Sequence, residues 1–498
     1  MKKMKLVMVG NGMAGVRTLE ELLKIAPDLY DITVFGAEPH PNYNRILLSP
    51  VLAGEQTLDE IVLNPLSWYA ENSITLHTGK KVVRIDRVKR VVHAADGTES
   101  PYDRLLLATG SHPFILPVPG KDLPGVIAYR DIADTQAMID AATKYKHAVV
   151  IGGGLLGLEA ANGLMLRGMH VTVVHLNDWL MERQLDDVAA RLLQKSLQDR
   201  GLHFKLGTQT QALVAGPNEE NNGRVAAVHF KDGSRIPADL VVMAAGIRPN
   251  TDLAEACGLH CARGVVVNDT MQTITDPRIY SVGECAAHRG IAYGLVAPLF
   301  EQGKVCATHL GQFGIGRYTG SQTSTKLKVT GIDLFSAGHF MGAASGKPED
   351  ADCEEIVLSD PFGGVYKKLV IRGDKLIGAV MYGDTVDGSW YFKLLREGRA
   401  VSDIRDKLMF GESNIGDVGH QGHSKAAAMA DADEVCGCNG VSKGSICKAI
   451  KEKGLFTLEE VRKQTKASAS CGSCTGLVEQ LLMFTAGGDY SASPKTKA

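Results

Sequence analysis

Apolar and polar positions along the chain repeat one order of elements twice. The apolar run KLVMVG, residues 5–10, predicts a short strand that ends at a glycine-rich turn. Apolar residues then recur at helical spacing over residues 14–26, and DITVFGAE, residues 31–38, predicts a second strand. The segment 147–178 has the same order of strand, glycine turn, helix and strand. Two βαβ units therefore lie about 140 residues apart, and each is expected to bind a dinucleotide.

Further strands are predicted between and after the two units, over KKVVRIDRVKRVVHAADG (80–97), YDRLLLATGS (102–111), ADLVVMAAGIRPN (238–250) and RGVVVNDTMQT (263–273). A three-layer nucleotide-binding domain needs such strands when a second nucleotide domain is inserted into it. KLVIRGDKLIGAVMYGD (368–384) predicts a strand pair in a small α+β domain. Residues 411–434 combine glycines, polar residues and alanines, which is typical of a linker.

Composition indicates a globular protein of several domains. A chain of 498 residues is long enough for about three or four domains. The net charge of -2 gives no support for a nucleic-acid or anionic-membrane surface. The apolar run at the start is too short for a signal-peptide core, and no run reaches membrane-spanning length. A cytoplasmic protein is therefore expected, with neither a nucleic acid nor a membrane as partner.

The first glycine turn has the pattern of a dinucleotide-binding loop. Gly10, Gly12 and Gly15 form G-x-G-x-x-G between a strand and a helix, and Glu38 follows the next strand. Glycines let the backbone approach a pyrophosphate, the helix N-terminus stabilises its charge, and the carboxylate accepts hydrogen bonds from ribose hydroxyls. The placement of all these parts favours this interpretation over an ordinary tight turn.

The second glycine turn repeats the pattern but changes the acidic position. Gly152, Gly154 and Gly157 again lie between strand and helix, whereas the following strand ends at His175. A carboxylate there would favour the ribose of NADH, and a nearby arginine would favour the 2′-phosphate of NADPH. Neither marker is present, so the choice of nicotinamide nucleotide stays open. His175 could contact the cofactor or be a surface histidine without such a contact.

Cysteines crowd near the C-terminus. Two close pairs, Cys436 with Cys438 and Cys471 with Cys474, form a ligand set for zinc or for an iron–sulfur cluster. Structural zinc pairs usually have two to four residues between the cysteines, so the single-residue spacing of the first pair favours the cluster. Cys447, in a segment that looks helical, is expected to be a small buried apolar residue.

The remaining cysteines give no sign of a thiol relay. Disulfide reductases that use a flavin need a redox-active cysteine pair beside it, usually early in the chain. The first cysteine here is Cys257, and with Cys261 it has no partner pair for a metal. Electrons are therefore expected to leave by another route.

The first 410 residues resemble the flavoprotein reductases with two dinucleotides, which include rubredoxin and ferredoxin reductases. The segments LLLATGS (105–111), AAGIRPN (244–250) and TDPRIYSVGECAA (275–287) carry this resemblance. PNYNRILLSPVLAGE (41–55) is similar to the large subunit of assimilatory NAD(P)H nitrite reductases, although Pro50 replaces a lysine of related ferredoxin reductases. CGCNGVSKGSICKAI and CGSC resemble bacterioferritin-associated ferredoxin, a small helical [2Fe-2S] domain.

The resemblance implies residues for each cofactor. For FAD these are Gly10, Gly12, Met13, Ala14, Gly15, Glu38, Arg45, Val83, Ala108, Thr109, Gly110, Gly283 and Glu284, where Glu284 replaces the usual aspartate. For NAD(P)H they are Gly152, Gly154, Leu155, Leu156, Gly157, Glu159, His175 and Gly246. The implied [2Fe-2S] ligands are Cys436, Cys438, Cys471 and Cys474, and Cys447 is left out. No side chain is implied as a catalytic acid or base, because the cofactors carry the hydride transfer.

The expected fold class is α/β, with two Rossmann-like domains, a small α+β interface domain and a small helical [2Fe-2S] domain. The expected parts are an FAD domain in two segments (1–118 and 246–320), an inserted NAD(P)H domain (119–245), the interface domain (321–410), the linker (411–434), the cluster domain (435–486) and a disordered tail (487–498).

These parts imply an NAD(P)H-dependent oxidoreductase that supplies electrons for nitrite reduction to ammonia in nitrate assimilation. The family's chain is normally longer, and its later part carries sirohaem and a [4Fe-4S] cluster. Either this chain is a fragment, or a partner carries that centre, such as a small nitrite reductase subunit. One alternative is the reductase component of a nitrate reductase or an oxygenase. A second alternative, from another class, is a zinc-binding regulatory protein with vestigial nucleotide folds.

Overall fold

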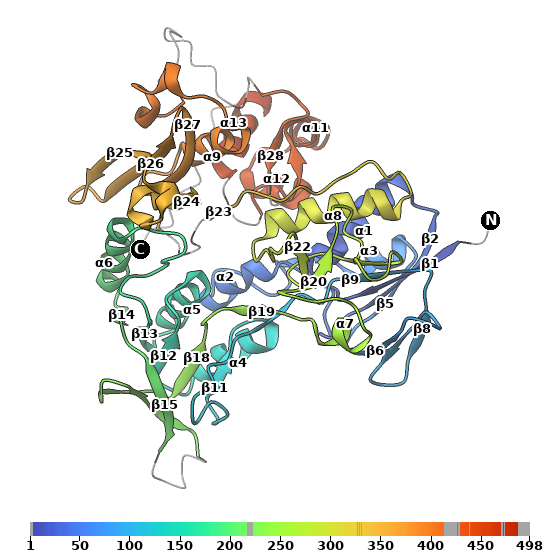
Figure 1. The fold of residues 1–498 in the computed structure, drawn as a ribbon, viewed down its shortest axis with the longest axis horizontal. Coiled ribbons are helices and arrows are strands. Elements are labelled where there is room, and N and C mark those ends of the chain that lie inside the picture. The colour runs from blue at the N-terminus through green and yellow to red at the C-terminus, as the bar shows by residue number, and fades with distance from the viewer. Residues whose placement is uncertain are drawn as a thin grey trace. The chain divides into compact units, whose positions relative to one another are not determined.

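The computed structural model describes residues 3–216, 223–325, 327, 329, 331–412, 426, 429–437, 439–469, 472 and 474–486 (Figure 1). It divides into two compact units, Met1–Arg405 and Asp406–Ala498, and each is described by itself. Cys438, Cys471, most of the expected linker and the expected tail 487–498 lie outside the described residues.

The first unit begins with a parallel sheet whose strand order is β21-β9-β1-β2-β5. Its strands are β1 (Met4–Val9), β2 (Tyr30–Phe35), β5 (Ile74–His77), β9 (Arg104–Leu107) and β21 (Ile279–Ser281). The expected strand, helix and strand at the start are confirmed, since α1 (Met13–Ile25) connects β1 to β2. Because β21 follows the whole second nucleotide domain in sequence, the sheet is completed only after that domain has been inserted.

Side chains of β1 alternate between two hydrophobic cores. Leu6 and Met8 pack with α1 and α8 (Val296–Leu310), which lie together over one face of the sheet (Figure 1). Val7 and Val9 pack on the other face with the three-stranded sheet of β6 (Val82–Asp86), β7 (Val91–Ala94) and β8 (Glu99–Pro101). Burial on both faces explains why this strand is a nearly continuous apolar run.

The second nucleotide domain contains a parallel sheet with the order β11-β18-β12-β13-β14. Its strands are β11 (Val126–Ala128), β12 (His147–Ile151), β13 (His170–Val174), β14 (His203–Lys205) and β18 (Leu240–Met243). Three helices accompany it: α4 (Ile132–Ala142), α5 (Leu155–Leu166) and α6 (Asp187–Asp199). A small antiparallel sheet joins β15 (Thr210–Ala215), β16 (Val225–Phe230) and β17 (Arg235–Pro237).

The two connections between the nucleotide domains pair with each other. β10 (Ser111–Pro113) leads out of the first domain, β19 (Ile247–Pro249) leads back, and the two form an antiparallel ribbon. Shorter elements of this part are β3 (Asn42–Tyr43), α2 (Leu48–Ala53), β4 (Val62–Asn64), α3 (Leu66–Glu71), α7 (Asp252–Ala256), β20 (Val265–Val267), β22 (Ala286–His288) and a 3₁₀ turn at Arg45–Leu47.

The expected α+β domain follows as an antiparallel sheet with the order β23-β24-β27-β26-β25. Its elements are β23 (Ser324–Thr325), β24 (Leu334–Gly338), β25 (Cys353–Asp360), β26 (Val365–Arg372), β27 (Lys375–Tyr382) and α9 (Gly388–Glu397). The predicted strand pair is confirmed, because β26 and β27 are hydrogen-bonded neighbours joined by a tight turn. Short 3₁₀ turns occupy Gly342–Ser345, Pro348–Asp350 and Ser402–Ile404.

The second unit is a small helical domain. A 3₁₀ turn (Leu408–Phe410) is followed by a short hairpin of β28 (Glu434–Cys436) and β29 (Val441–Ser442), and then by α11 (Lys443–Lys453), α12 (Leu458–Thr465) and α13 (Thr475–Ala486). Thr457 and Glu460 form a reciprocal capping box at the start of α12, which fixes that helix despite its small buried face. Cys447 lies in α11, so the expectation of a helix there is confirmed.

The described part of the chain contains no helix with both the length and the apolar composition required to cross a membrane.

A buried cluster of charged and polar side chains connects α6 to β26 within the first unit. Asp186 is the N-cap of α6 and accepts from the backbone N–H of Ala189 at 3.1 Å. Its other oxygen accepts from the Tyr366 hydroxyl at 2.7 Å and lies 3.4 Å from the Lys368 ammonium. Only 6% of the Asp186 side chain and 5% of the Lys368 side chain are exposed. Lys368 also lies 3.3 Å from a carboxylate oxygen of Glu355, so Asp186 is one of its two carboxylate partners.

We therefore expect Asp186→Ala to lower the free energy of unfolding by about 2 to 3 kcal/mol, since the helix cap and the acceptor of the Tyr366 hydroxyl are lost and Lys368 keeps only Glu355 as a carboxylate partner. The matched control is Asp187→Ala, which removes an exposed carboxylate paired with Arg191 and should cost about 1 kcal/mol or less. Urea unfolding followed by circular dichroism would measure both. Equal midpoints for the two variants would contradict a fastening role for Asp186.

Candidate functional site

Three glycines shape the first loop, each for a different reason. Gly10 has φ +105°, and a Cβ there would lie 2.1 Å from the carbonyl oxygen of Ala108. A Cβ on Gly15 would lie 2.8 Å from the side chains of Ala108 and Met8. Gly12, by contrast, has no atom within 4 Å of its Cβ direction, so this side of the loop is open. Tight packing behind the loop and open space before it are what close approach of a pyrophosphate requires.

The loop opens directly into the N-terminus of α1. No side chain caps this helix, and its first turn has no acidic residue. Its first N–H groups and its dipole therefore favour an anion next to Met13 and Ala14. The sequence-predicted residues Gly10 to Gly15 are thus brought together in one phosphate-binding geometry.

A charged group lies beyond the end of β2. Arg45 donates to one oxygen of Glu38 at 2.5 Å, and the Tyr43 hydroxyl donates to the other at 2.7 Å. Burial raises the pKa of Tyr43 above its ordinary value, so the phenol keeps its proton and remains a donor. Arg45 also donates to the carbonyl oxygen of Arg130 at 2.8 Å. The structure thus holds the two predicted residues Glu38 and Arg45 together as an ion pair.

Glu284, predicted as the second FAD carboxylate, is held by two donors. Ser111 donates to it at 2.8 Å, and the Arg130 guanidinium forms a close ion pair with the same oxygen. Gly283, with φ +89°, donates its N–H to the buried Gln302 side chain at 3.0 Å. Arg130 and Ser111 were not predicted. Arg130 belongs to no motif, and only the fold brings it to a carboxylate 154 positions away in sequence.

The second loop reproduces the first. Gly152 has φ +129°, and its Cβ would lie 2.2 Å from the carbonyl oxygen of Ala244; a Cβ on Gly157 would lie 1.9 Å from the Gly152 oxygen. Gly154 is again open, with no atom within 4 Å, and α5 begins at Leu155 without a side-chain cap. Gly246, with φ +117°, also faces open space. The second fingerprint therefore has the same space for a pyrophosphate.

Glu159 lies where the two nucleotide domains meet. It projects from α5 and accepts from the Ser49 hydroxyl in α2 at 2.6 Å, and Tyr129 donates to the same hydroxyl at 3.2 Å. Pro50 is the next residue of α2. The hydrogen bond from Ser49 to Glu159 thus connects a residue of the first nucleotide domain to a residue of the second.

The interpretation of His175 as a surface residue is wrong. Its side chain is 10% exposed and lies against the second glycine loop. Nδ1 accepts from the backbone N–H of Gly153 at 3.1 Å, and Nε2 lies 3.0 Å from a carboxylate oxygen of Glu182. Glu182 was not predicted, because it lies seven positions further along a loop and belongs to no known motif.

The other predicted contacts differ in exposure. Ala108 is buried behind the first loop, and Thr109 exchanges hydrogen bonds with Asn250 at 2.7 and 3.1 Å. Gly110, with φ +67°, is the last residue before β10. Val83 lies in β6 and is 53% exposed.

Two of the predicted cluster ligands are described. Cys436, at the end of β28, and Cys474, just before α13, are both buried and belong to the same hydrophobic core. The Asn439 amide donates toward the Cys436 sulfur at 3.7 Å. Cys438 and Cys471 lie outside the described residues, so the ligand set stays a prediction. The two buried sulfurs are suitable ligands for an iron–sulfur cluster. Cluster thiolates are stabilised by hydrogen bonds from N–H groups, such as the one from Asn439.

The other cysteines are consistent with structural roles. Burial raises the pKa of the Cys257 thiol and raises that of Cys261 to about 11. Neither is therefore a thiolate at neutral pH. Cys447 is only partly buried, and its sulfur accepts from Thr485 at 3.4 Å.

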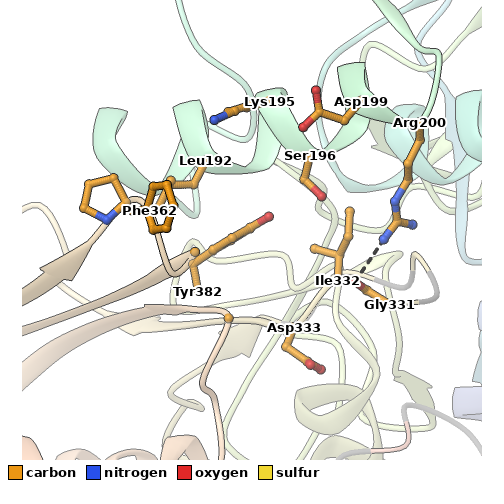
Figure 2. A pocket seen from close by; sticks show the side chains of 13 residues that line it. Leu192, Lys195, Ser196, Asp199, Arg200, Gly331, Ile332, Asp333, Phe362 and Tyr382 are labelled. Atoms are coloured by element: carbon orange, nitrogen blue, oxygen red, sulfur yellow. Dashed lines mark hydrogen bonds between the residues drawn. The ribbon is translucent and has the colours of Figure 1, made fainter.

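A hollow of about 520 Å³ lies between α6 and loops of the α+β domain (Figure 2). Lys195, Ser196 and Asp199 of α6 line it together with Phe362 and Tyr382, and Arg200 donates to the carbonyl oxygen of Gly331 at 2.9 Å. None of its lining residues is a predicted site residue.

Comparison with known proteins gives the family. Residues 4–305 match the model of the pyridine nucleotide-disulphide oxidoreductases. Residues 324–399 match the rubredoxin NAD+ reductase C-terminal domain, and residues 434–483 match the BFD-like [2Fe-2S] binding domain.

Two relatives come from Bacillus subtilis (strain 168). The chain is 50% identical over 498 residues to a nitrite reductase [NAD(P)H], covering 100% of this chain and 60% of that protein. It is 44% identical over 496 residues to an assimilatory nitrate reductase electron transfer subunit, covering 100% of this chain and 62% of that protein. The chain thus spans about three fifths of the length of these relatives.

Among solved structures, the ferredoxin reductase for the CYP199A2 system from Rhodopseudomonas palustris is similar. Its TM-score is 0.71 at 25% identity, and the match covers 80% of this chain and 95% of that one.

These matches confirm the expected fold class, the cofactors FAD, NAD(P)H and [2Fe-2S], and an NAD(P)H-dependent flavoprotein oxidoreductase. The open pyrophosphate spaces in both loops fit this cofactor set. Since the family match extends over more than half of the 498 residues, the chain belongs to the pyridine nucleotide-disulphide oxidoreductase family.

Proposed function

We propose that this chain is the electron-input part of a nitrite-reducing system. It oxidises NAD(P)H and delivers the electrons through its small C-terminal domain to a centre that reduces nitrite to ammonia. The observation that carries the proposal is the pair of glycine loops, each with open space for a pyrophosphate, in the same chain as a cysteine domain. The similarity along the whole chain to a nitrite reductase [NAD(P)H] supports the choice of acceptor.

The first loop is proposed to hold FAD, which supplies the conversion of a two-electron hydride into single electrons. Gly10 to Gly15 and the α1 N-terminus would stabilise the pyrophosphate. Glu38, oriented by its hydrogen bonds from Arg45 and Tyr43, would accept from ribose hydroxyls. Glu284 would accept from the ribityl chain, in an orientation that Ser111 and Arg130 fix.

The remaining predicted FAD contacts are proposed to line this site through their backbone. Ala108, Thr109 and Gly110 follow β9, and the contact of Ala108 with Gly10 closes the loop from behind. Val83 is proposed as an outer contact in β6.

The second loop is proposed to hold NAD(P)H. Gly152 to Gly157, with Leu155 and Leu156 at the start of α5, would bind its pyrophosphate, and Gly246 would leave room beside it. Glu159, held by Ser49, would position the nicotinamide end where the two domains meet. None of these residues needs to move a proton; their contribution is binding and orientation.

Cys436, Cys438, Cys471 and Cys474 are proposed as the four thiolate ligands of the [2Fe-2S] cluster. The proposed partner is an electron-accepting protein or module with sirohaem and [4Fe-4S], such as a small nitrite reductase subunit. The proposed location is the cytoplasm, where thiols such as Cys285 and Cys306 remain reduced.

A second function is favoured by one specific observation. The relative named as an assimilatory nitrate reductase electron transfer subunit is also similar along the whole chain. The second proposal is therefore electron delivery to a nitrate-reducing subunit.

A reconstitution assay distinguishes the two proposed electron acceptors. We expect NADH oxidation by the chain to drive formation of ammonium from nitrite when a sirohaem and [4Fe-4S] module is added. A Cys436→Ser chain, still able to reduce ferricyanide, is the control and should give no ammonium. Turnover with a nitrate reductase catalytic subunit, and none with the sirohaem module, would establish the second function instead.

The two open glycines allow a reciprocal test of the nucleotide sites. Gly12→Ala and Gly154→Ala should both fold, since each residue is an N-cap with negative φ and alanine there costs about 1 kcal/mol or less. Each new methyl group would enter the space for one pyrophosphate and lower the affinity for that nucleotide by roughly tenfold or more. Flavin content and NADH titration would show loss of FAD only in Gly12→Ala and loss of NADH binding, with FAD kept, only in Gly154→Ala. Identical behaviour of the two variants would contradict the assignment of the loops.

The cysteine domain offers a matched pair of substitutions. Cys436→Ser should abolish the electron paramagnetic resonance signal of the dithionite-reduced cluster, because a thiolate ligand is lost. Cys447→Ser, eleven positions further on, should keep the signal. Flavin reduction by NADH should be unchanged in both variants. A signal that survives in Cys436→Ser with the wild-type g-values would refute the ligand assignment.

A further inference from the structure

The end of β13 lacks the acidic residue that a dinucleotide fold places there for ribose recognition. His175 occupies this position and is nearly buried. A Cβ on Gly153 would lie 2.8 Å from the His175 ring, so the imidazole packs directly against the second glycine loop. The ring is therefore part of the floor of the proposed nicotinamide-nucleotide site.

The hydrogen bonds of the ring assign its protons. Nδ1 accepts from the Gly153 N–H at 3.1 Å and so carries no proton of its own in this contact. The proton of the neutral ring then lies on Nε2, which donates to Glu182 at 3.0 Å. His175 thus connects the glycine loop to a carboxylate through one rigid ring.

The segment that carries Glu182 is bonded to the same glycine. Met181 donates its N–H to the Gly153 carbonyl oxygen at 3.0 Å, while the Gly153 N–H is bonded to His175. Met181 has φ +53°, an uncommon conformation for a residue with a side chain, and it turns the chain so that Glu182 returns to the loop. The first bond holds the Met181–Glu182 segment against the glycine loop, and the Glu182 carboxylate lies at the Nε2 side of the His175 ring, with 28% of its side chain exposed.

We propose that Glu182, positioned by His175, recognises the adenosine ribose hydroxyls of NADH and excludes the 2′-phosphate of NADPH. This inference rests on the proposed assignment of the second glycine loop to the nicotinamide nucleotide. Glu182 thereby replaces, from a loop, the carboxylate that other dinucleotide folds carry on the strand itself.

The negative charge of Glu182 favours binding of NADH over NADPH. The hydrogen bond from His175 holds the pKa of Glu182 below its usual range, so the carboxylate is ionised at neutral pH. An ionised carboxylate accepts from two ribose hydroxyls but repels a phosphate group. Arg183, the next residue, is exposed and is the cation of this segment that a 2′-phosphate would contact.

The test uses the oxidised FAD-loaded full chain and two ligands without nicotinamide, ADP-ribose and its 2′-phosphate. Isothermal titration calorimetry then reports recognition of the ribose without any redox step. We expect the wild type to bind ADP-ribose at least about tenfold more tightly than the 2′-phosphate. Glu182→Gln should lower the affinity for ADP-ribose by roughly tenfold and remove most of the preference for ADP-ribose over its 2′-phosphate.

Two further variants separate positioning from a structural effect. His175→Asn keeps an acceptor for the Gly153 N–H but cannot reach Glu182, so it should reduce the preference while keeping the thermal midpoint of unfolding. Asp199→Asn removes an exposed carboxylate at the other end of α6 and should leave both affinities unchanged.

Unchanged preference in Glu182→Gln would overturn the role of Glu182 while leaving the glycine-loop assignment intact. A wild type that prefers the 2′-phosphate would also overturn it and would point to Arg183. Absence of binding of either ligand by the wild type would refute the loop assignment itself, and the inference with it.

Discussion

The close approach of a glycine to a carbonyl oxygen of the neighbouring strand is the constraint on which both nucleotide sites depend. Gly10 meets Ala108 in this way, and Gly152 meets Ala244. Each glycine ends the strand at which the order of its sheet reverses, β1 between β9 and β2, and β12 between β18 and β13. A crevice forms at such a point outside the carboxyl ends of the strands. A larger residue would push the loop away from the sheet and close this crevice.

The first site is completed by one residue of the connection to the inserted domain and by one residue of that domain itself. Ser111 lies in β10 and Arg130 follows β11, yet both hold Glu284, which follows β21. The Arg130 backbone also accepts from Arg45. The charged groups of the first site therefore depend on where the second nucleotide domain lies. Mispositioning of that domain would leave half-buried charges without partners, which is a strong penalty.

The sequence predicted well those features that depend on local chemistry. Glycine turns between strand and helix, the strand pair in the α+β domain and the helix around Cys447 all follow from short segments, and the structure has them. It could not predict contacts that only the fold creates. Arg130 reaches Glu284 across an inserted domain, and Glu182 reaches His175 from an irregular loop. The burial of His175 was missed because a histidine after a strand looks the same whether or not a loop covers it.

The ribbon of β10 and β19 is the route by which the chain leaves the first nucleotide domain and returns to it. Ser111 pairs with Pro249 and Pro113 with Ile247, so exit and re-entry are adjacent in space although more than a hundred residues separate them in sequence. The intervening segment can therefore change in length or sequence without altering the strand order of the first sheet. One ribbon carries both crossings of the chain between the two parallel sheets.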